Sequence, residues 1–177
     1  MKKSIVLGVT GSIAAYKAAD LVSKLVKLNY DVTVIMTESA KKLVGEQTFL
    51  TLSRNPVISD LWSVDSWKPE HIQLAEKSSL FVVAPCTANF IGKYTSGIAD
   101  DALTTYALSH TEKVLLAPAM NVNMWQHAAV QSNCKILKER GVSFIGPDTG
   151  DLACGINAKG HISNIDSIVK KIVSLIV

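Results

Sequence analysis

Short apolar runs bounded by turn-forming residues recur along this chain, and they constrain its fold more than any other feature. They are SIVLGV (4–9), DVTVIMT (31–37), LFVVAP (80–85), KVLLAP (113–118) and SFIGPD (143–148). Runs that are apolar on both faces are typical of parallel strands in a sheet that helices cover on both sides. The sequence therefore predicts an α/β fold, in which residues 1–177 form a single three-layer, Rossmann-like domain around a doubly wound, mostly parallel sheet.

The stretch between the first two runs, residues 13–28, has the apolar period of a helix. Its buried face is predicted to hold Ala14, Ala18, Leu21, Val22 and Leu25, and its solvated face Lys17, Asp20, Lys24 and Lys27. Residues 54–70 show no clear period, and we interpret them as an irregular connection with some strand. The final IVKKIVSLIV has the pattern of an amphipathic helix end.

Composition excludes several classes of protein. Hydrophobic residues make up 48% of the 177 residues and charged residues 19%, which argues against disorder and favours a homo-oligomer. Lys and Arg (18) exceed Asp and Glu (15), but no basic stripe interleaved with aromatic residues indicates nucleic-acid binding. No run approaches the ~18 apolar residues of a membrane span. The three cysteines lack metal-ligand spacing, so we expect reduced thiols, no metal and a cytoplasmic protein.

Ligands of open α/β sheets bind beyond the carboxyl ends of the strands. The segments expected there hold most of the unusual polar residues: TGSIA (10–14), TESA (37–40), APCTANF (84–90), APAMNVNMW (117–125) and GPDTGDLACG (146–155). Gly8 and Gly11 do not fit the GxGxxG pattern of dinucleotide sites. Gly11, Ser12 and the helix start at Ile13 do suit a single phosphate, with a plain tight turn as the alternative.

Hydroxyl groups recur at the other strand ends. Thr37, Ser39 and Thr87 are suited to donate hydrogen bonds to a phosphate or a ribityl chain, and Asn89 to contact the edge of a heterocycle. Each of them could instead cap a helix without any ligand. Because three hydroxyl groups are expected at one edge of the sheet, we favour a ligand.

Two further side chains are candidates for chemistry. His71, in PEHIQLAEKS, is expected on a helix or turn just before a strand, where a lone histidine is usually structural. Cys154 lies on a loop between Gly150 and Gly155, and a thiol in such a place is a candidate acid, base or nucleophile. Cys134 falls on a helix and is expected in the core, and a buried, space-filling position is the simplest interpretation of Cys86.

The order of several motifs resembles that of the homo-oligomeric flavin-containing cysteine decarboxylases. The motifs are GVTGSIAAYKAADL, MTESA, EHIQLA, APCTANF, SGIADDALTT, APAMNVNMW and LACG. Together they extend from about residue 4 to residue 155, and PAMNVNMW fits the family pattern P-x-M-N-x-x-M-W at every fixed position. Within the family, the chain most resembles the members that act on 4'-phosphopantothenoylcysteine.

The resemblance implies an FMN cofactor and a set of site residues. FMN would be bound by Gly11, Ser12, Ile13, Thr37, Ser39, Thr87, Ala88, Asn89, Phe90 and Ala119. The implied catalytic residues are His71, Asn121, which would bind the substrate carboxylate, and Cys154, which would act in the final reduction. Met120, Asn121, Ala153 and Cys154 would contact the substrate.

The resemblance also implies a reaction, the conversion of 4'-phosphopantothenoylcysteine to 4'-phosphopantetheine in coenzyme A biosynthesis. The flavin would oxidise the cysteine end to a thioaldehyde, which accepts the electrons released with CO2, and would then reduce the resulting enethiol with Cys154 as proton donor. The implied assembly is a homotrimer or a group of trimers. Because the chain printed here ends at Val177, a separate ligase is expected for the preceding step.

The chain departs from the family pattern in three places. PCTANF replaces P-A-S-A-N-T, so Phe90 would contact FMN through its backbone, and Asp101 stands where asparagine is frequent. ACGINAKGHI lacks the usual A-C-G-D-x-G-x-G, which leaves Lys159 and His161 as candidates to contact a phosphate. Three alternatives therefore stay open: a decarboxylase of a peptide's carboxyl-terminal cysteine, a flavin prenyltransferase, and a non-catalytic flavin-binding regulatory subunit.

Overall fold

The computed structural model describes residues 2–61, 70–151, 155 and 157–176. Six strands of this part of the chain form one parallel sheet in the order β3-β2-β1-β4-β5-β6. They are β1 (Ser4–Val9), β2 (Asp31–Met36), β3 (Val57–Ile58), β4 (Ser78–Cys86), β5 (Val114–Pro118) and β6 (Ser143–Phe144). The strand order reverses direction between β1 and β4, which makes this pair the topological switch point of a doubly wound sheet.

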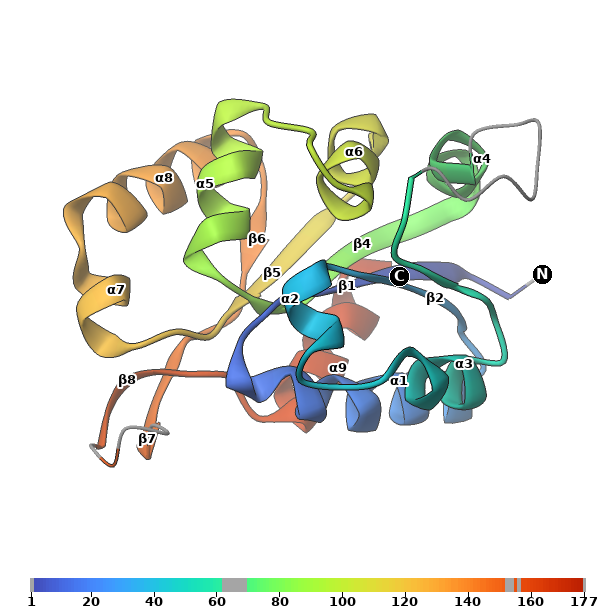
Figure 1. The fold of residues 1–177 in the computed structure, drawn as a ribbon, viewed down its shortest axis with the longest axis horizontal. Helices are drawn as coiled ribbons and strands as arrows, with labels where there is room; N and C mark the ends of the chain where they lie inside the picture. The colour runs from blue at the N-terminus through green and yellow to red at the C-terminus, as the bar shows by residue number, and fades with distance from the viewer. Residues whose placement is uncertain (1, 62–69, 152–154, 156, 177) are drawn as a thin grey trace.

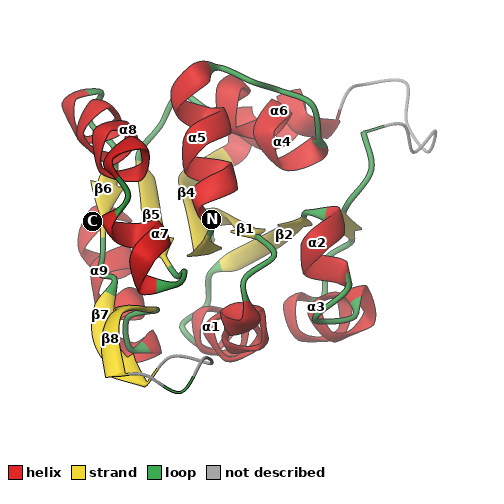
Figure 2. Cartoon of the chain, turned by 60° about the vertical axis from the view of Figure 1, so that its left-hand side comes forward, coloured by secondary structure: helices red, strands yellow, loops and turns green. Residues whose placement is uncertain are grey.

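Helices cover both faces of the sheet, so the predicted three-layer α/β fold is confirmed (Figures 1 and 2). One face carries the 3₁₀ helix η1 (Ile13–Tyr16) with α1 (Lys17–Lys27), α3 (Glu46–Ser53) and α9 (Ile165–Ile176). The other face carries α4 (Glu70–Lys77), α5 (Ala88–Ser96), α6 (Ala102–Ser109) and α8 (Ala128–Glu139). Two short helices, α2 (Glu38–Lys41) and α7 (Val122–Gln126), follow the carboxyl ends of β2 and β5.

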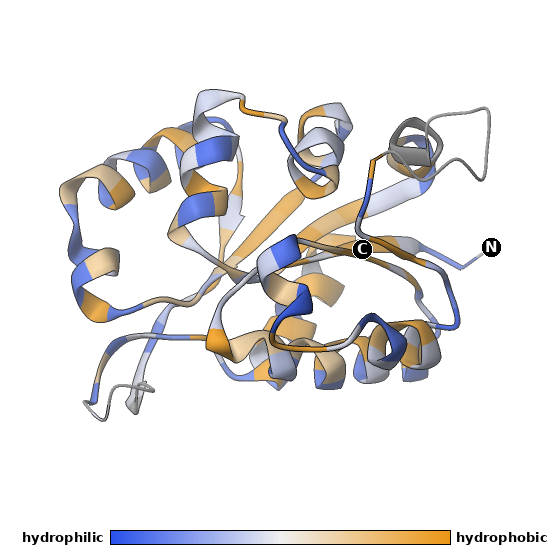
Figure 3. Cartoon of the chain, viewed as in Figure 1, coloured by the Kyte–Doolittle hydropathy of each residue, from blue (hydrophilic) through white to orange (hydrophobic). Residues whose placement is uncertain are grey.

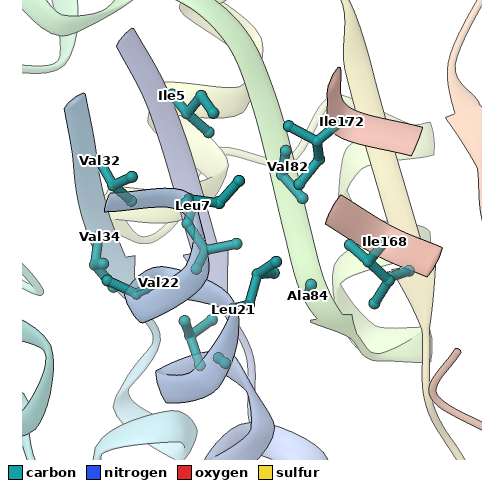
Figure 4. Close-up of a cluster of buried hydrophobic side chains, with 14 of the residues drawn as sticks. Ile5, Leu7, Leu21, Val22, Val32, Val34, Val82, Ala84, Ile168 and Ile172 are labelled. Carbon is teal, nitrogen blue, oxygen red and sulfur yellow. The ribbon is translucent and has the colours of Figure 1, made fainter. Parts of the chain in front are cut away.

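Successive side chains of a strand point to opposite faces of the sheet, so the apolar strands form a hydrophobic core on each face. In β1, Ile5 and Leu7 point toward α1 and α9, whereas Val6 points toward the layer that contains α5 and α6. Figure 4 shows the first of these cores, with Leu21 of α1 inserted among the strand side chains. Burying a leucine of this kind stabilises the fold by about 1.5–3 kcal/mol. In Figure 3, β5 is hydrophobic along its length, while the helices carry hydrophilic residues on their outer faces.

The predicted strand at 143–148 is wrong in part. β6 ends at Phe144, and Asp148 begins a separate antiparallel hairpin made of β7 (Asp148–Asp151) and β8 (Asn157–His161). Pro147, which has no backbone N–H to donate to a ladder, lies between the two strands. The hairpin projects from the carboxyl edge of the main sheet, beside α7 (Figure 1).

The remaining predictions of secondary structure are close to what is observed. The helix expected at 13–28 is present, but its first turn is the 3₁₀ helix η1, a frequent arrangement at helix starts. The connection at 54–70 contains strand β3, as expected, and its residues 62–69 lie outside the described part. The amphipathic carboxyl-terminal helix is α9. No helix within the described residues is long and apolar enough to cross a membrane.

Candidate active site

At the switch point, Thr10 connects the end of β1 to the end of β4 by hydrogen bonds. Thr10, directly after β1, is 1% exposed, and its hydroxyl donates to the carbonyl oxygen of Pro85 over 2.7 Å. The hydroxyl oxygen of Thr10 in turn accepts a hydrogen bond from the backbone N–H of Thr87 over 3.1 Å. Thr10 therefore fixes the positions of the two loops that diverge at the carboxyl edge.

Helix amino termini converge at this edge, each with a capping hydroxyl. The side-chain oxygen of Ser12 accepts from Ala14 N–H at 3.4 Å, and that of Thr37 from Ala40 N–H at 3.2 Å. Thr87 accepts from the N–H of Phe90 in the same way, at 3.4 Å. The capping alternative is thus confirmed for Thr37 and Thr87, and Ser12 also caps a helix. It does not exclude a ligand, because a hydroxyl that accepts a hydrogen bond still has its own proton to donate.

The larger of two cavities at the edge has a volume of about 510 Å³, within the usual range of 300–1,000 Å³ for ligand sites. It opens between the loops after β1 and β5 and the last residues of β8. Its lining consists of Gly11, Ser12, Ile13, Ala14, Tyr16, Lys17, Thr87, Ala119, Met120, Asn121, Met124, Gly160, His161 and Ile162.

The smaller cavity, of about 390 Å³, is more polar in its side chains. It is lined by Thr10, Gly11, Thr37, Glu38, Ser39, Thr87, Asn89, Phe90, Lys93, Asp101, Thr104 and Met124. Gly11, Thr87 and Met124 line both cavities, so the two are neighbours. A Cβ atom at Gly11 would collide with Ser39, so glycine is required for the loops after β1 and β2 to approach this closely.

Lys93, which lines the smaller cavity, forms ion pairs with two carboxylates. The Lys93 ammonium lies 2.7 Å from Asp100 and 3.5 Å from Asp101. The hydrogen bond that Lys93 donates to Asp100 raises the pKa of Lys93 and lowers the pKa of Asp100. Asp101 also caps α6, since its carboxylate accepts from the N–H of Thr104 at 2.7 Å. Lys93 therefore stays charged, with its charge compensated by neighbouring carboxylates.

Asn121 lies in the loop between β5 and α7, at the rim of the larger cavity. Two backbone hydrogen bonds of 3.0 Å hold this loop, one from Ala119 N–H to the carbonyl of Cys86 and one from Met120 N–H to the carbonyl of Gly160. The Asn121 side-chain oxygen caps α7 by accepting from Asn123 N–H at 2.8 Å. Its amide is exposed and fixed in orientation, which suits recognition of a carboxylate.

The structure brings most of the predicted site residues together. Gly11, Ser12, Ile13, Thr37, Ser39, Thr87, Asn89, Phe90, Ala119, Met120 and Asn121 line one or both cavities. The Phe90 side chain is 2% exposed and packs in the core, and Ala88 is outside both linings. Ala153 and Cys154 lie outside the described residues.

His71 is placed only by its backbone, within α4. This helix leads directly into the amino end of β4 (Figure 1). The described residues that line the two cavities come from loops and helices at the carboxyl end of the sheet and from the hairpin. The predicted position on a helix just before a strand is confirmed.

Sequence reasoning missed two residues of the site. Thr10 could have been noticed as a hydroxyl that directly follows an apolar strand. Lys17 was expected on a solvated face, but it is half-buried, lines the larger cavity, and its Nζ lies 3.0 Å from Nε2 of His161. The apolar period of the helix could not show this contact, because His161 is 144 residues away along the chain.

The two described cysteines are buried and free, as expected for Cys134 and consistent with a space-filling Cys86. Burial raises the pKa of Cys134, and it raises the pKa of Cys86 well above its usual range, so both thiols stay protonated and unreactive. Among the described residues, no group of three or more His, Cys, Asp or Glu side chains is arranged to hold a metal ion.

Comparisons with known proteins agree with this architecture. The family model described as Flavoprotein matches residues 1–177. A probable phosphopantothenoylcysteine decarboxylase from Streptococcus mutans is 42% identical over 175 residues, which cover 97% of this chain and 98% of that protein. The chain spans less than half (44% and 42%) of the Coenzyme A biosynthesis bifunctional proteins CoaBC of Borreliella burgdorferi and Bacillus subtilis.

Two solved structures share the fold over nearly the whole chain. A mutant PPC decarboxylase complexed with pantothenoylaminoethenethiol superposes with a TM-score of 0.90 at 25% identity and covers 98% of both chains. The FMN-dependent cysteine decarboxylase SpaF superposes with a TM-score of 0.85 at 27% identity, over 96% of this chain and 94% of its own.

Proposed function

Because this chain belongs to the Flavoprotein family, we propose that it is an FMN-dependent decarboxylase that converts 4'-phosphopantothenoylcysteine to 4'-phosphopantetheine. The observation that carries the proposal is the position of Asn121. Its amide is held at the rim of the larger cavity by the loop that contains the PAMNVNMW motif, next to converging helix amino termini. The relative from Streptococcus mutans, matched over 98% of its length, supports the same substrate.

The residues of the two cavities fit FMN. The close approach at Gly11, the capping hydroxyls of Ser12, Thr37 and Thr87, and the exposed hydroxyl of Ser39 supply donors for a phosphate or a ribityl chain. Gly11, Thr87 and Met124 line both cavities, so one extended ligand could occupy parts of both. Ala119, buried and small, leaves room for a flat ring in the larger cavity.

When bound, FMN would supply a two-electron acceptor for the thiol end of the substrate and would return the electrons after CO2 has left. The chain's own residues would orient the substrate and manage its protons. The amide of Asn121 would bind the carboxylate that is lost, and Met120 and Met124 would exclude water from it. His71 and Cys154 would move protons, and Cys154 would donate the proton that accompanies the final reduction of the enethiol double bond.

A homo-oligomer, specifically a homotrimer or a group of trimers, forms part of the proposal. Ile13, Tyr16 and Met124, which line the larger cavity, are 63%, 62% and 49% exposed, an arrangement that favours coverage by another copy. The position of α4 supports the same idea, because His71 could then act at a neighbouring subunit's cavity. We also propose a cytoplasmic location, in keeping with the free thiols of Cys86 and Cys134.

Mass analysis of the product tests this function. The visible spectrum of the purified protein is recorded, and the protein is then incubated with 4'-phosphopantothenoylcysteine or with a peptide that ends in cysteine. A yellow protein that releases CO2 from the first compound and leaves the peptide unchanged is the expected result. Turnover of the peptide alone would replace the proposed substrate, and a protein that does not bind added FMN would overturn the proposal altogether.

A further inference from the structure

Lys17 and His161 form a hydrogen-bonded pair inside the larger cavity. Lys17 is the first residue of α1, and His161 is the last residue of β8. The 3.0 Å contact between Nζ and Nε2 joins the two elements across a half-buried surface, and both side chains line the cavity that Asn121 borders. The function proposed above uses neither side chain, although the sequence already marks His161 as a candidate to contact a phosphate.

A bulge in β8 places His161 at the cavity. Asp148 pairs with His161, and the next residue of β7, Thr149, pairs with Lys159. Gly160 is therefore an extra residue of β8 that has no partner in the β7 register. Bulges of this kind change the direction in which the following side chain points. As a result His161 lines the cavity, whereas Lys159 is exposed and is not part of its lining.

The neighbouring strand fixes the imidazole ring. A Cβ atom at Gly150 would lie 3.1 Å from Cγ and 3.3 Å from Cβ of His161, so the ring packs directly on the backbone of β7. The ring therefore has little freedom to turn away from Lys17. The pair is a built feature of the cavity wall rather than a chance contact between two long side chains.

The pair carries a positive charge that nothing among the described residues balances. Lys24, Lys41 and Lys93 each form an ion pair with a carboxylate, at 3.2, 2.5 and 2.7 Å. Lys17 forms no ion pair with any described carboxylate. An ammonium can only donate, so Nε2 of His161 is the acceptor, and the ring proton is on Nδ1. Lys17 retains two further N–H donors, as an anion site requires.

We propose that Lys17 and His161 bind the terminal phosphate of 4'-phosphopantothenoylcysteine, an inference that rests on the proposed function. Two anions must be accommodated, the phosphate of FMN and that of the substrate. The hydroxyls of Thr37 and Ser39 line only the smaller cavity, whereas Lys17 and His161 line only the larger cavity, as does Asn121. The substrate's carboxylate and phosphate are then both recognised within one cavity, and the FMN phosphate within the other.

Calorimetric titration of the FMN-loaded protein with 4'-phosphopantetheine and with pantetheine tests the phosphate site without requiring turnover. The wild-type protein should bind the phosphorylated compound roughly tenfold to a hundredfold more tightly, the usual value of charged hydrogen bonds. Lys17→Gln should remove most of this preference and leave the affinity for pantetheine unchanged. His161→Gln should reduce the preference in the same direction.

Lys27→Gln is the matched control, because Lys27 is an exposed lysine at the other end of the same helix. It should keep the full preference for the phosphorylated compound. Equal binding of the two compounds by the wild-type protein would overturn the inference, as would a Lys17→Gln protein that keeps the preference. A Lys17→Gln protein that loses FMN while keeping the preference would assign Lys17 to the cofactor instead.

Failure of the phosphate site and failure of the proposed reaction give different experimental results. A wild-type protein that prefers the phosphorylated compound but releases no CO2 would keep the phosphate site and reject the reaction. A protein that releases CO2 equally well from substrates with and without the phosphate would keep the reaction and reject the site.

Discussion

The backbone N–H of Met120 donates a hydrogen bond to the carbonyl oxygen of Gly160 over 3.0 Å. This bond joins strand β8 to the loop that carries Asn121, although the two are separated by some forty residues of sequence. Gly160 has a φ of +151°, and a Cβ atom there would collide with the carbonyl oxygen of Met120. Only glycine therefore permits this contact between the hairpin and the loop after β5.

Gly160→Ala should accordingly push β8 away from the loop and disturb both Asn121 and His161. Backbone strain of this kind costs about 1–3 kcal/mol, so we expect kcat/KM for 4'-phosphopantothenoylcysteine to fall by roughly tenfold to a hundredfold. Gly45→Ala is the control, since no atom lies within 4 Å of a Cβ atom at that position. A Gly160→Ala enzyme with normal steady-state kinetics would show that the hairpin contact does not shape the site.

Gly11→Ala should abolish flavin binding. The added methyl group would collide with Ser39 and separate the loops after β1 and β2, which frame the smaller cavity. The purified variant should be colourless while the wild-type protein is yellow, as the ratio of absorbance near 450 nm to that near 280 nm measures (roughly, for any flavin). Gly92→Ala is the control, because Gly92 lies inside α5 with only an ordinary 3.8 Å contact. A yellow Gly11→Ala protein would remove Gly11 from the cofactor site.

The sheet could be predicted from the sequence because short, continuous apolar runs and helices of period 3.6 are local patterns. The capping hydroxyls were found for the same reason, since Thr37 and Thr87 directly follow their strands. The hairpin β7–β8 was not found, because Asn157–His161 is polar and lacks alternation. Lys17 was misplaced because its partner comes from that hairpin, so its environment depends on a tertiary contact that no local pattern encodes.

His110 should make stability depend on pH. Nε2 lies 3.2 Å from the Lys113 carbonyl oxygen, which can only accept, so Nε2 carries the proton and Nδ1 accepts from the Tyr106 hydroxyl at 3.1 Å. Burial lowers the pKa of His110 below its ordinary value. The folded state therefore binds this proton less readily than the unfolded chain. The contribution of His110 to stability is present above pH ~6.5 and is lost as the pH falls below it.

Urea unfolding between pH 7.5 and pH 5 measures this contribution. In the wild-type protein, His110 should lower the free energy of unfolding by at most about 1.4 kcal/mol per pH unit below its unfolded pKa. His110→Gln, which cannot titrate, should show a shallower slope. Tyr106→Phe, the control, keeps the imidazole and should keep a steep slope. Identical slopes for the wild-type protein and His110→Gln would mean that His110 has the same pKa in both states.

Cys154→Ser should separate the two halves of the proposed reaction. Without a thiol to donate the proton that accompanies reduction of the enethiol double bond, CO2 should still be released, but the enethiol should accumulate. Mass spectrometry would detect a product that lacks two hydrogens relative to 4'-phosphopantetheine. Cys134→Ser is the comparison, because that thiol is buried in the core and should affect stability rather than product identity. Normal product from Cys154→Ser would exclude the assigned proton transfer.

His71→Asn should bind FMN normally and release no CO2, because the described residues that line the two cavities belong to other elements. Helix α4 lies at the amino end of β4, which favours a role for His71 at a neighbouring subunit. If His71 serves a neighbouring subunit, a mixture with Asn121→Ala should regain activity after the two inactive proteins are unfolded and refolded together. An intact site then needs a cavity from one variant and a histidine from the other. With equal amounts and random assembly, about a quarter of the sites should be intact. No recovery, with mixed oligomers verified by native mass spectrometry, would place His71 at the cavity of its own chain or outside the mechanism.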